Sequence, residues 1–166
     1  MTSTWFFVLL EISVIACGLV SGVFLTFSDF VMRSLDGAKT SAGVEVMQVI
    51  NREVFRTVFM VLLLSMSALS PFLMGYAYFR IAGPTSALIM IGGALYFAGV
   101  FGVSLIFNVP MNNHLDTKGH SSPEAATYWT TIYFPQWTFW NYVRALASAG
   151  SAICFLIAGV WLAQGG

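Results

Sequence analysis

The chain has 166 residues, 58% of them hydrophobic and only 8% charged, and its seven basic residues balance its seven acidic ones. Soluble domains carry roughly 25% charged residues and about 45–50% apolar ones. The composition therefore excludes soluble, disordered and disulfide-scaffold proteins, and the zero net charge offers no basic surface to a nucleic acid. It predicts an all-α integral membrane protein whose main partner is the lipid bilayer.

Four apolar stretches are long enough to cross a bilayer as helices, which takes about 20 residues each. They run approximately from Trp5 to Phe27, from Val54 to Phe79, from Thr85 to Phe107 and from Tyr142 to Ala163. The short turn Ala82-Gly83-Pro84 joins the second and the third, whereas the other two connections are long. Because a chain in lipid must satisfy its own backbone hydrogen bonds, we expect a four-transmembrane-helix bundle.

The basic residues predict how this bundle is oriented. Only Arg80 lies on the side of the two termini. The other six lie on the side of the long connections: Arg33, Lys39, Arg52, Arg56, Lys118 and Arg144. The positive-inside rule then predicts a multi-pass protein of the cell inner membrane, with the long connections in the cytoplasm and both termini outside.

Two parts of the chain resemble each other. Residues 22–28 align with residues 102–108, and residues 47–51 align with residues 137–141, so that Asn51 matches Asn141. Each half is then a helix, a long loop, a short amphipathic stretch ending in Asn, and a second helix. We predict one membrane domain, 1–166, with internal repeats 5–80 and 85–163 related by an axis along the membrane normal. The alternative is a chance similarity among residues that membrane proteins use often.

Polar residues gather on the side of the long connections. Asn108 and Asn112 lie one helical turn apart, at the end of the third apolar stretch. The spacing i, i+3, i+4, i+7 places a second set on one helix face: Trp137, Trp140, Asn141 and Arg144. Gln48 and Asn51 form a similar face before the second stretch.

These residues have two interpretations. Trp and Tyr collect at membrane interfaces, and we favour such a belt for Tyr128, Trp129 and Tyr133. Carboxamides have no comparable reason to collect there, so a pocket roofed by the long loops accounts better for the asparagines and Arg144. We therefore expect five side chains to converge on one cavity near the cytoplasmic boundary: Asn108, Asn112, Trp137, Asn141 and Arg144. Arg144 should hydrogen-bond to at least one of these asparagines or to Ser28.

Four stretches in this order resemble the anthrone oxygenase family of small four-helix membrane proteins, and in particular its bacterial members. They are Gly22-Val-Phe-Leu-Thr-Phe-Ser-Asp-Phe-Val-Met32, Gly43-Val-Glu-Val-Met-Gln48-Val-Ile-Asn51, Asn108-Val-Pro-Met-Asn112 with Leu115, and Trp137-Thr-Phe-Trp140-Asn141-Tyr-Val-Arg144. Fungal members oxidise anthrones to anthraquinones with molecular oxygen, without a metal or flavin. The resemblance thus implies a membrane oxygenase for a hydrophobic aromatic or quinone-type substrate, with no cofactor.

The chemistry of an anthrone suggests roles for the polar residues. Its acidic methylene gives an enolate that can reduce oxygen directly, so the protein must supply an aromatic slot, hydrogen-bond donors and a base. Candidate donors to the enolate oxygen are Asn108, Asn112, Asn141 and Arg144. Candidate substrate-binding residues are Trp137, Trp140, Gln48, Asn51 and Ser28. Candidate bases are Glu45, Glu53 and His114, and the sequence does not choose among them.

Several alternatives stay open. Only two histidines, His114 and His120, are present, so we predict no metal site, although a single axial histidine such as His114 suffices to hold a haem. Instead of an enzyme, the chain can be a non-catalytic subunit of a larger membrane complex, a lipid- or quinone-binding protein, or a transporter. Its possible protein partners are further copies of itself or a larger membrane complex. Glu11, inside the first apolar stretch, is expected to reach the headgroups or to pair with Arg80.

Overall fold

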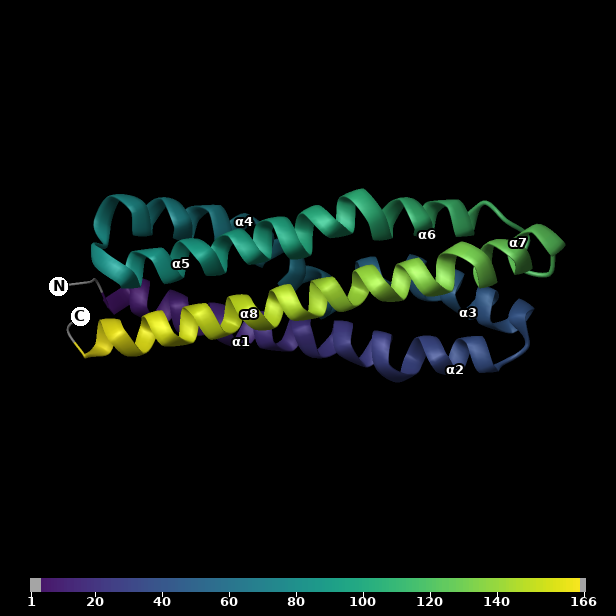
Figure 1. The fold of residues 1–166 in the computed structure, drawn as a ribbon, viewed down its shortest axis with the longest axis horizontal. Helices are drawn as coiled ribbons and strands as arrows, with labels where there is room; N and C mark the ends of the chain where they lie inside the picture. The colour runs from purple at the N-terminus through teal and green to yellow at the C-terminus, as the bar shows by residue number, and fades with distance from the viewer. Residues whose placement is uncertain (1–3, 165–166) are drawn as a thin grey trace.

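The computed structural model describes residues 4–164, and these residues are helical throughout, apart from short turns (Figure 1). The first half comprises α1 (Thr4–Thr26), η1 (Phe27–Val31), α2 (Met32–Gly37), α3 (Thr40–Glu53), η2 (Val54–Arg56) and α4 (Val58–Arg80). The second half comprises α5 (Gly83–Tyr96), η3 (Phe97–Gly102), η4 (Ser104–Asn108), α6 (Val109–Asp116), α7 (Pro123–Tyr128), η5 (Trp129–Trp137) and α8 (Thr138–Ala163). Of these short segments η2 is a 3-10 helix, and η1, η3, η4 and η5 are π-helical.

Four continuous helices are long and apolar enough to cross a membrane. They are Thr4–Gly37, Val58–Arg80, Gly83–Asp116 and Pro123–Ala163. The predicted all-α four-helix membrane bundle is therefore confirmed. Helix α1 begins and α8 ends at the same end of the bundle, where the turn between α4 and α5 also lies (Figure 1).

The long connections differ from the prediction, because they are mostly helical. Helix α1 continues through η1 and α2 to Gly37, and α5 continues through α6 to Asp116. The fourth helix begins at Pro123, well before the predicted Tyr142. Hydropathy identifies the part of a helix that lipid can solvate, but a helix extends wherever its backbone bonds and packing permit, so the apolar stretches underestimate its length.

These extensions build a helical head on the membrane bundle. Helices α2, α3, α6 and α7 lie at the end of the bundle opposite to the chain ends (Figure 1). The head has its own buried core, with Met32, Met47, Leu115 and Trp129 among its residues. The roof expected from loops is thus made of packed helices, which hold side chains in more fixed positions than loops do.

The membrane part is held by close helix contacts. Helices α1 and α8 pack along their lengths, as do α5 and α8. A Cβ atom added at Gly92 of α5 would come within 2.9 Å of the Phe155 ring, so the missing side chain lets the two helices approach. Small residues serve this purpose in membranes because helix association there depends on close packing.

The two halves differ at one joint. In the second half, η5 runs into α8 without a break, whereas in the first half extended backbone at Thr57 (φ −107°, ψ 156°) separates η2 from α4. The Thr57 hydroxyl accepts a hydrogen bond from the amide of Met60 and caps α4. The equivalence of Asn51 and Asn141 in a repeat stays a prediction.

Candidate functional site

A cavity of about 430 Å³ lies where the membrane bundle meets the head. Its wall is mostly apolar and comes from α1, η1, α3, η2, α4, η3, η4, α6, η5 and α8. Phe24, Phe59 and Leu63 are among the apolar residues that line it. A largely apolar hollow with a few polar groups is the usual form of a small-molecule site.

The five side chains expected to converge all line this cavity: Asn108, Asn112, Trp137, Asn141 and Arg144. They come from η4, α6, η5 and α8. The predicted hydrogen bond is also present, since the Arg144 guanidinium donates to Asn141 Oδ1. The predicted convergence is therefore confirmed as geometry.

Arg144 is the buried cation of the cavity. Arg144 is only 7% exposed, and its guanidinium forms no ion pair with a carboxylate of residues 4–164. Its terminal nitrogens donate to neutral oxygens, Ser104 Oγ at 3.1 Å and Asn141 Oδ1 at 2.5 Å, while its Nε has no hydrogen-bond partner. The guanidinium lies 4.3 Å from the ring centre of Phe24 and 5.5 Å from that of Trp137. Aromatic faces and neutral dipoles offset only part of a buried charge, so the cavity favours an anion.

Asn141 and Ser28 hold this cation in place. Asn141 Nδ2 donates to Ser28 Oγ and to the backbone oxygen of Phe24, each at 2.6 Å. Both ends of the amide are thereby engaged, and its Oδ1 must point to Arg144. Ser28 is buried but is not part of the cavity wall, so its contact with the site passes through Asn141.

The other two asparagines expose different groups. Asn112 Oδ1 accepts from the Tyr133 hydroxyl and from Trp137 Nε1, each at 2.8 Å, which leaves its Nδ2 as the free donor. Asn108 Nδ2 donates to the backbone oxygen of Trp137 at 3.2 Å, while its buried Oδ1 has no donor. The wall thus offers a ligand donors from Arg144 and Asn112 and an acceptor from Asn108.

Among the three candidate bases, Glu53 lines the cavity. Its carboxylate lies 3.7 Å from Arg56 and is largely exposed, so it sits at the mouth of the cavity. Glu45 is on the outer face of α3, 3.9 Å from His120, and His114 is exposed and meets the Tyr128 ring edge-on. Neither of these two lines the cavity, and a haem on His114 would lie outside it.

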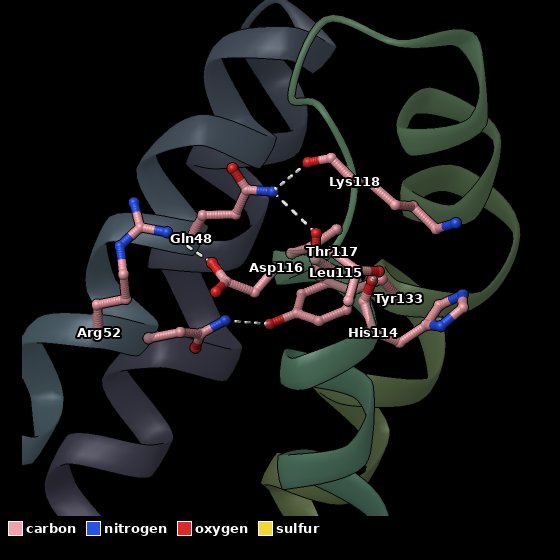
Figure 2. Close-up of polar contacts among 9 residues, drawn as sticks. Gln48, Arg52, His114, Leu115, Asp116, Thr117, Lys118 and Tyr133 are labelled. Carbon is pink, nitrogen blue, oxygen red and sulfur yellow. Dashed lines mark hydrogen bonds and ion pairs between the residues drawn. The ribbon is translucent and has the colours of Figure 1, made fainter.

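Three of the five candidate substrate-binding residues lie outside the cavity wall: Ser28, described above, Trp140 and Gln48. Trp140 stacks on Phe107 with a ring separation of 3.6 Å. Gln48 donates to the backbone oxygens of Leu115 and Lys118 at 2.8 and 2.9 Å, and so satisfies carbonyls at the end of α6 (Figure 2). Asn51 does line the cavity and donates to the Tyr133 hydroxyl at 3.3 Å.

Helix α3 is thereby fastened to α6 on the outer side of the cavity. Next to Gln48, Arg52 forms an ion pair with Asp116 at 2.5 Å (Figure 2). This exposed pair contributes little to stability by itself, but together with the bonds of Gln48 it fixes the register of the two helices. Helix α3 forms part of the cavity wall, so this clamp shapes the site indirectly.

The belt interpretation is wrong for Trp129 and Tyr133. Both residues are fully buried in the core of the head, and Tyr133 touches the site through Asn112 and Asn51. Trp and Tyr occur both at membrane interfaces and in buried cores, so residue type does not separate the two cases. Only the spacing of the residues along the chain can do so. Trp129, Tyr133, Trp137 and Asn141 recur every four residues, a pattern that indicates one continuous helix face.

No group of three His, Cys, Asp or Glu side chains in residues 4–164 is arranged to hold a metal ion. The expected ion pair between Glu11 and Arg80 is not formed among the described residues. Instead, the Glu11 carboxylate lies against Gly159 of α8.

Comparison with known proteins adds a family assignment. The family model described as anthrone oxygenase matches residues 51–154, which is more than half of the chain and includes every polar residue of the cavity wall. A search of curated proteins and a search of solved structures each find no match. From the family match we conclude that the chain belongs to the anthrone oxygenase family.

Proposed function

We propose that this membrane protein is an oxygenase that oxidises a hydrophobic aromatic ketone, of the anthrone type, with molecular oxygen. The observation that carries the proposal is a buried guanidinium, Arg144, without a carboxylate partner, in the wall of an apolar cavity. Such a site favours a ligand that develops a negative charge during the reaction over one that is merely apolar. The family match supports oxygenase-like chemistry in general.

The reaction is balanced without any other reactant. Removal of one methylene proton gives an enolate, whose oxygen would be stabilised by Arg144 Nε and Asn112 Nδ2. The enolate carbon passes electrons to oxygen and bonds to one of its atoms, which gives a peroxide. Loss of the second hydrogen as a proton, with cleavage of the O–O bond, leaves a carbonyl and releases water. One anthrone and one oxygen molecule thus give one anthraquinone and one water.

Glu53 is the proposed base. It is the carboxylate among the described residues of the cavity wall, and its exposed position lets it return the proton to water. A base must reach its proton before its pKa matters, and the exposed positions of Glu45 and His114 away from the cavity give them no comparable access.

The proposed surroundings follow from the same features. We place the protein in the cell inner membrane with the head in the cytoplasm, because most basic residues lie in the head. Exposed apolar residues of the cavity wall, Phe55, Leu64 and Leu105, would let a hydrophobic substrate enter from the lipid.

The test is turnover by the purified protein in lipid nanodiscs. With anthrone as the probe, we expect oxygen uptake and anthraquinone formation in a one-to-one ratio, faster than the spontaneous reaction in empty nanodiscs. Equal rates with and without the protein would contradict an oxygenase that accepts anthrones.

A second candidate is a non-catalytic protein that binds a lipid or quinone. The observation in its favour is the mostly apolar cavity wall with membrane-facing residues. This candidate predicts a stoichiometric lipid or quinone in the mass spectrum of the detergent-purified protein, together with no anthrone turnover after that ligand is removed.

A further inference from the structure

Three buried aromatic rings form a continuous stack from the cavity into the head. The ring centres of Trp129 and Tyr133 are 5.4 Å apart with an interplanar angle of 19°, and those of Tyr133 and Trp137 are 6.1 Å apart with an angle of 20°. Trp137 lines the cavity, and Trp129 and Tyr133 are fully buried. The rings lie four residues apart along η5, a spacing that keeps them on one helix face.

The two ends of the stack have opposite electrostatic surroundings. At the cavity end, the Arg144 guanidinium lies 5.5 Å from the Trp137 ring centre. At the other end, Trp129 Nε1 donates a hydrogen bond of 3.0 Å to the carboxylate of Asp36, which is exposed to solvent. A positive charge on the stack is therefore disfavoured at Trp137 and favoured at Trp129.

Indole and phenol are the most readily oxidised of the uncharged side chains, and stacked rings exchange single electrons readily. We infer that the stack of Trp129, Tyr133 and Trp137 is a path along which an electron hole, the positive charge left by the loss of one electron, leaves the cavity and reaches the surface of the head. Its use in the cell rests on the oxygen chemistry proposed above, whereas the path itself depends only on the rings and charges.

The oxidant would be a peroxyl radical formed in the cavity by a one-electron side reaction. In that reaction the enolate gives one electron to an oxygen molecule, which departs as superoxide, and the resulting carbon radical binds a second oxygen molecule. The peroxyl radical takes one electron from Trp137 and one proton from water, with hydroxide as the by-product, and becomes a hydroperoxide. The electron hole moves from Trp137 across the ring of Tyr133 to Trp129, whose indole proton then moves to Asp36. A thiolate in the solvent then returns one electron to Trp129, Asp36 returns the proton, and two of the resulting thiyl radicals combine to a disulfide. The site is thereby spared oxidation.

A photochemical experiment tests the path without any substrate. Cys17 and Cys154 are free thiols and would first be replaced by alanine. Phe55, which is 67% exposed and lines the cavity, would then be replaced by cysteine and labelled with a ruthenium polypyridyl photo-oxidant. A light flash and an external electron acceptor create the oxidant at the cavity mouth, and transient absorption follows the neutral indolyl radical.

We expect this radical in the labelled protein and its loss in W129F and in D36N. Y133F should lower its yield, because a phenyl ring is harder to oxidise than a phenol. Asp36 is exposed, so D36N leaves the core of the head intact. The matched controls are W140F, which removes an indole outside the stack, and D29N, which removes another exposed carboxylate; both should retain the radical.

The path would be refuted by a labelled protein that yields no indolyl radical, or by W129F and D36N variants that yield as much of it as the parent. These outcomes do not depend on anthrone turnover. An inactive protein with an intact path would therefore contradict the proposed function alone, and an active protein without the path would contradict this inference alone.

Discussion

At the scale of single residues, the cavity is governed by how Arg144 is kept charged in an apolar place. Removing one partner of a buried charge is costly, because the charge then lacks compensation. Here the compensation comes from Ser104, Asn141 and two aromatic faces, and none of these is an anion. A substrate that becomes an enolate would supply the missing charge at the moment of reaction, which is differential stabilisation of the transition state.

Glu53 provides a direct test of the proposed base. Glu53→Gln should lower the rate of anthrone oxidation by about 10²–10⁴-fold, the usual contribution of general acid–base catalysis. Glu45→Gln is the matched control, since Glu45 is on the same helix but outside the cavity, and it should keep the parent rate. Steady-state oxygen uptake measures both. Equal rates for the two variants would remove Glu53 from the mechanism.

At the scale of elements, the position of α3 decides the shape of the cavity. This helix is held by polar bonds to α6 and by close packing on the end of α2. At Gly43 of α3, an added Cβ atom would lie 2.5 Å from the backbone oxygen of Leu35 and 3.6 Å from the Trp129 ring. The absence of a side chain at Gly43 is thus required by the fold.

Gly43→Ala should therefore destabilise the head by about 1–3 kcal/mol, the usual cost of overpacking. Thermal unfolding in detergent, followed by tryptophan fluorescence, should show a lower midpoint. Gly37→Ala is the control, because no atom lies within 4 Å of a Cβ added there and its φ is not positive. A Gly43→Ala midpoint equal to that of Gly37→Ala would show that α2 and α3 are not packed as described.

The sequence predicts the membrane elements well and the head poorly. Hydropathy locates the four spans because lipid exposure leaves a strong compositional signal. Hydropathy does not predict the helical form of residues 28–37 and 123–136, since polar residues such as Ser28 and Gln136 end an apolar stretch without ending a helix.

The candidate site could be predicted only in part, because helical spacing relates residues of one helix but not residues of different helices. Helical spacing brought Trp137, Asn141 and Arg144 to one face, as found. It could not place Glu45, Gln48 or His114, because the register between α3 and α6 is set by tertiary contacts such as that of Arg52 with Asp116. Nor could it find the roles of Tyr133 and Ser104, which become visible only through their bonds to Asn112 and Arg144.

At the scale of the whole molecule, the bundle has two dissimilar ends. One carries the chain ends and the turn between α4 and α5, and the other carries the head (Figure 1). The cavity lies where the head meets the membrane bundle. Five basic residues lie in the head and a sixth, Arg144, lies next to it, whereas the far end of the bundle has Arg80 as its basic residue. This asymmetry predicts that the head faces the cytoplasm.

Fusion reporters test that orientation. Alkaline phosphatase, which is active only outside the cytoplasm, should be active when fused after Gly166. The same reporter fused within residues 117–122, between α6 and α7, should be inactive. If a second reporter, one that is active only in the cytoplasm, were active when fused after Gly166, the proposed topology would be contradicted.

The central claim is that Arg144 and its cavity perform oxygen chemistry, and isotope incorporation tests it most directly. The measurement is the transfer of labelled molecular oxygen into anthraquinone by the protein in nanodiscs, compared with Arg144→Met and with Arg33→Met, which replaces an exposed arginine of α2 outside the cavity wall. The parent and Arg33→Met should incorporate the label well above empty nanodiscs. Arg144→Met, shown to be folded by circular dichroism and gel filtration, should fall to that background. Unchanged incorporation by a folded Arg144→Met variant would contradict the claim.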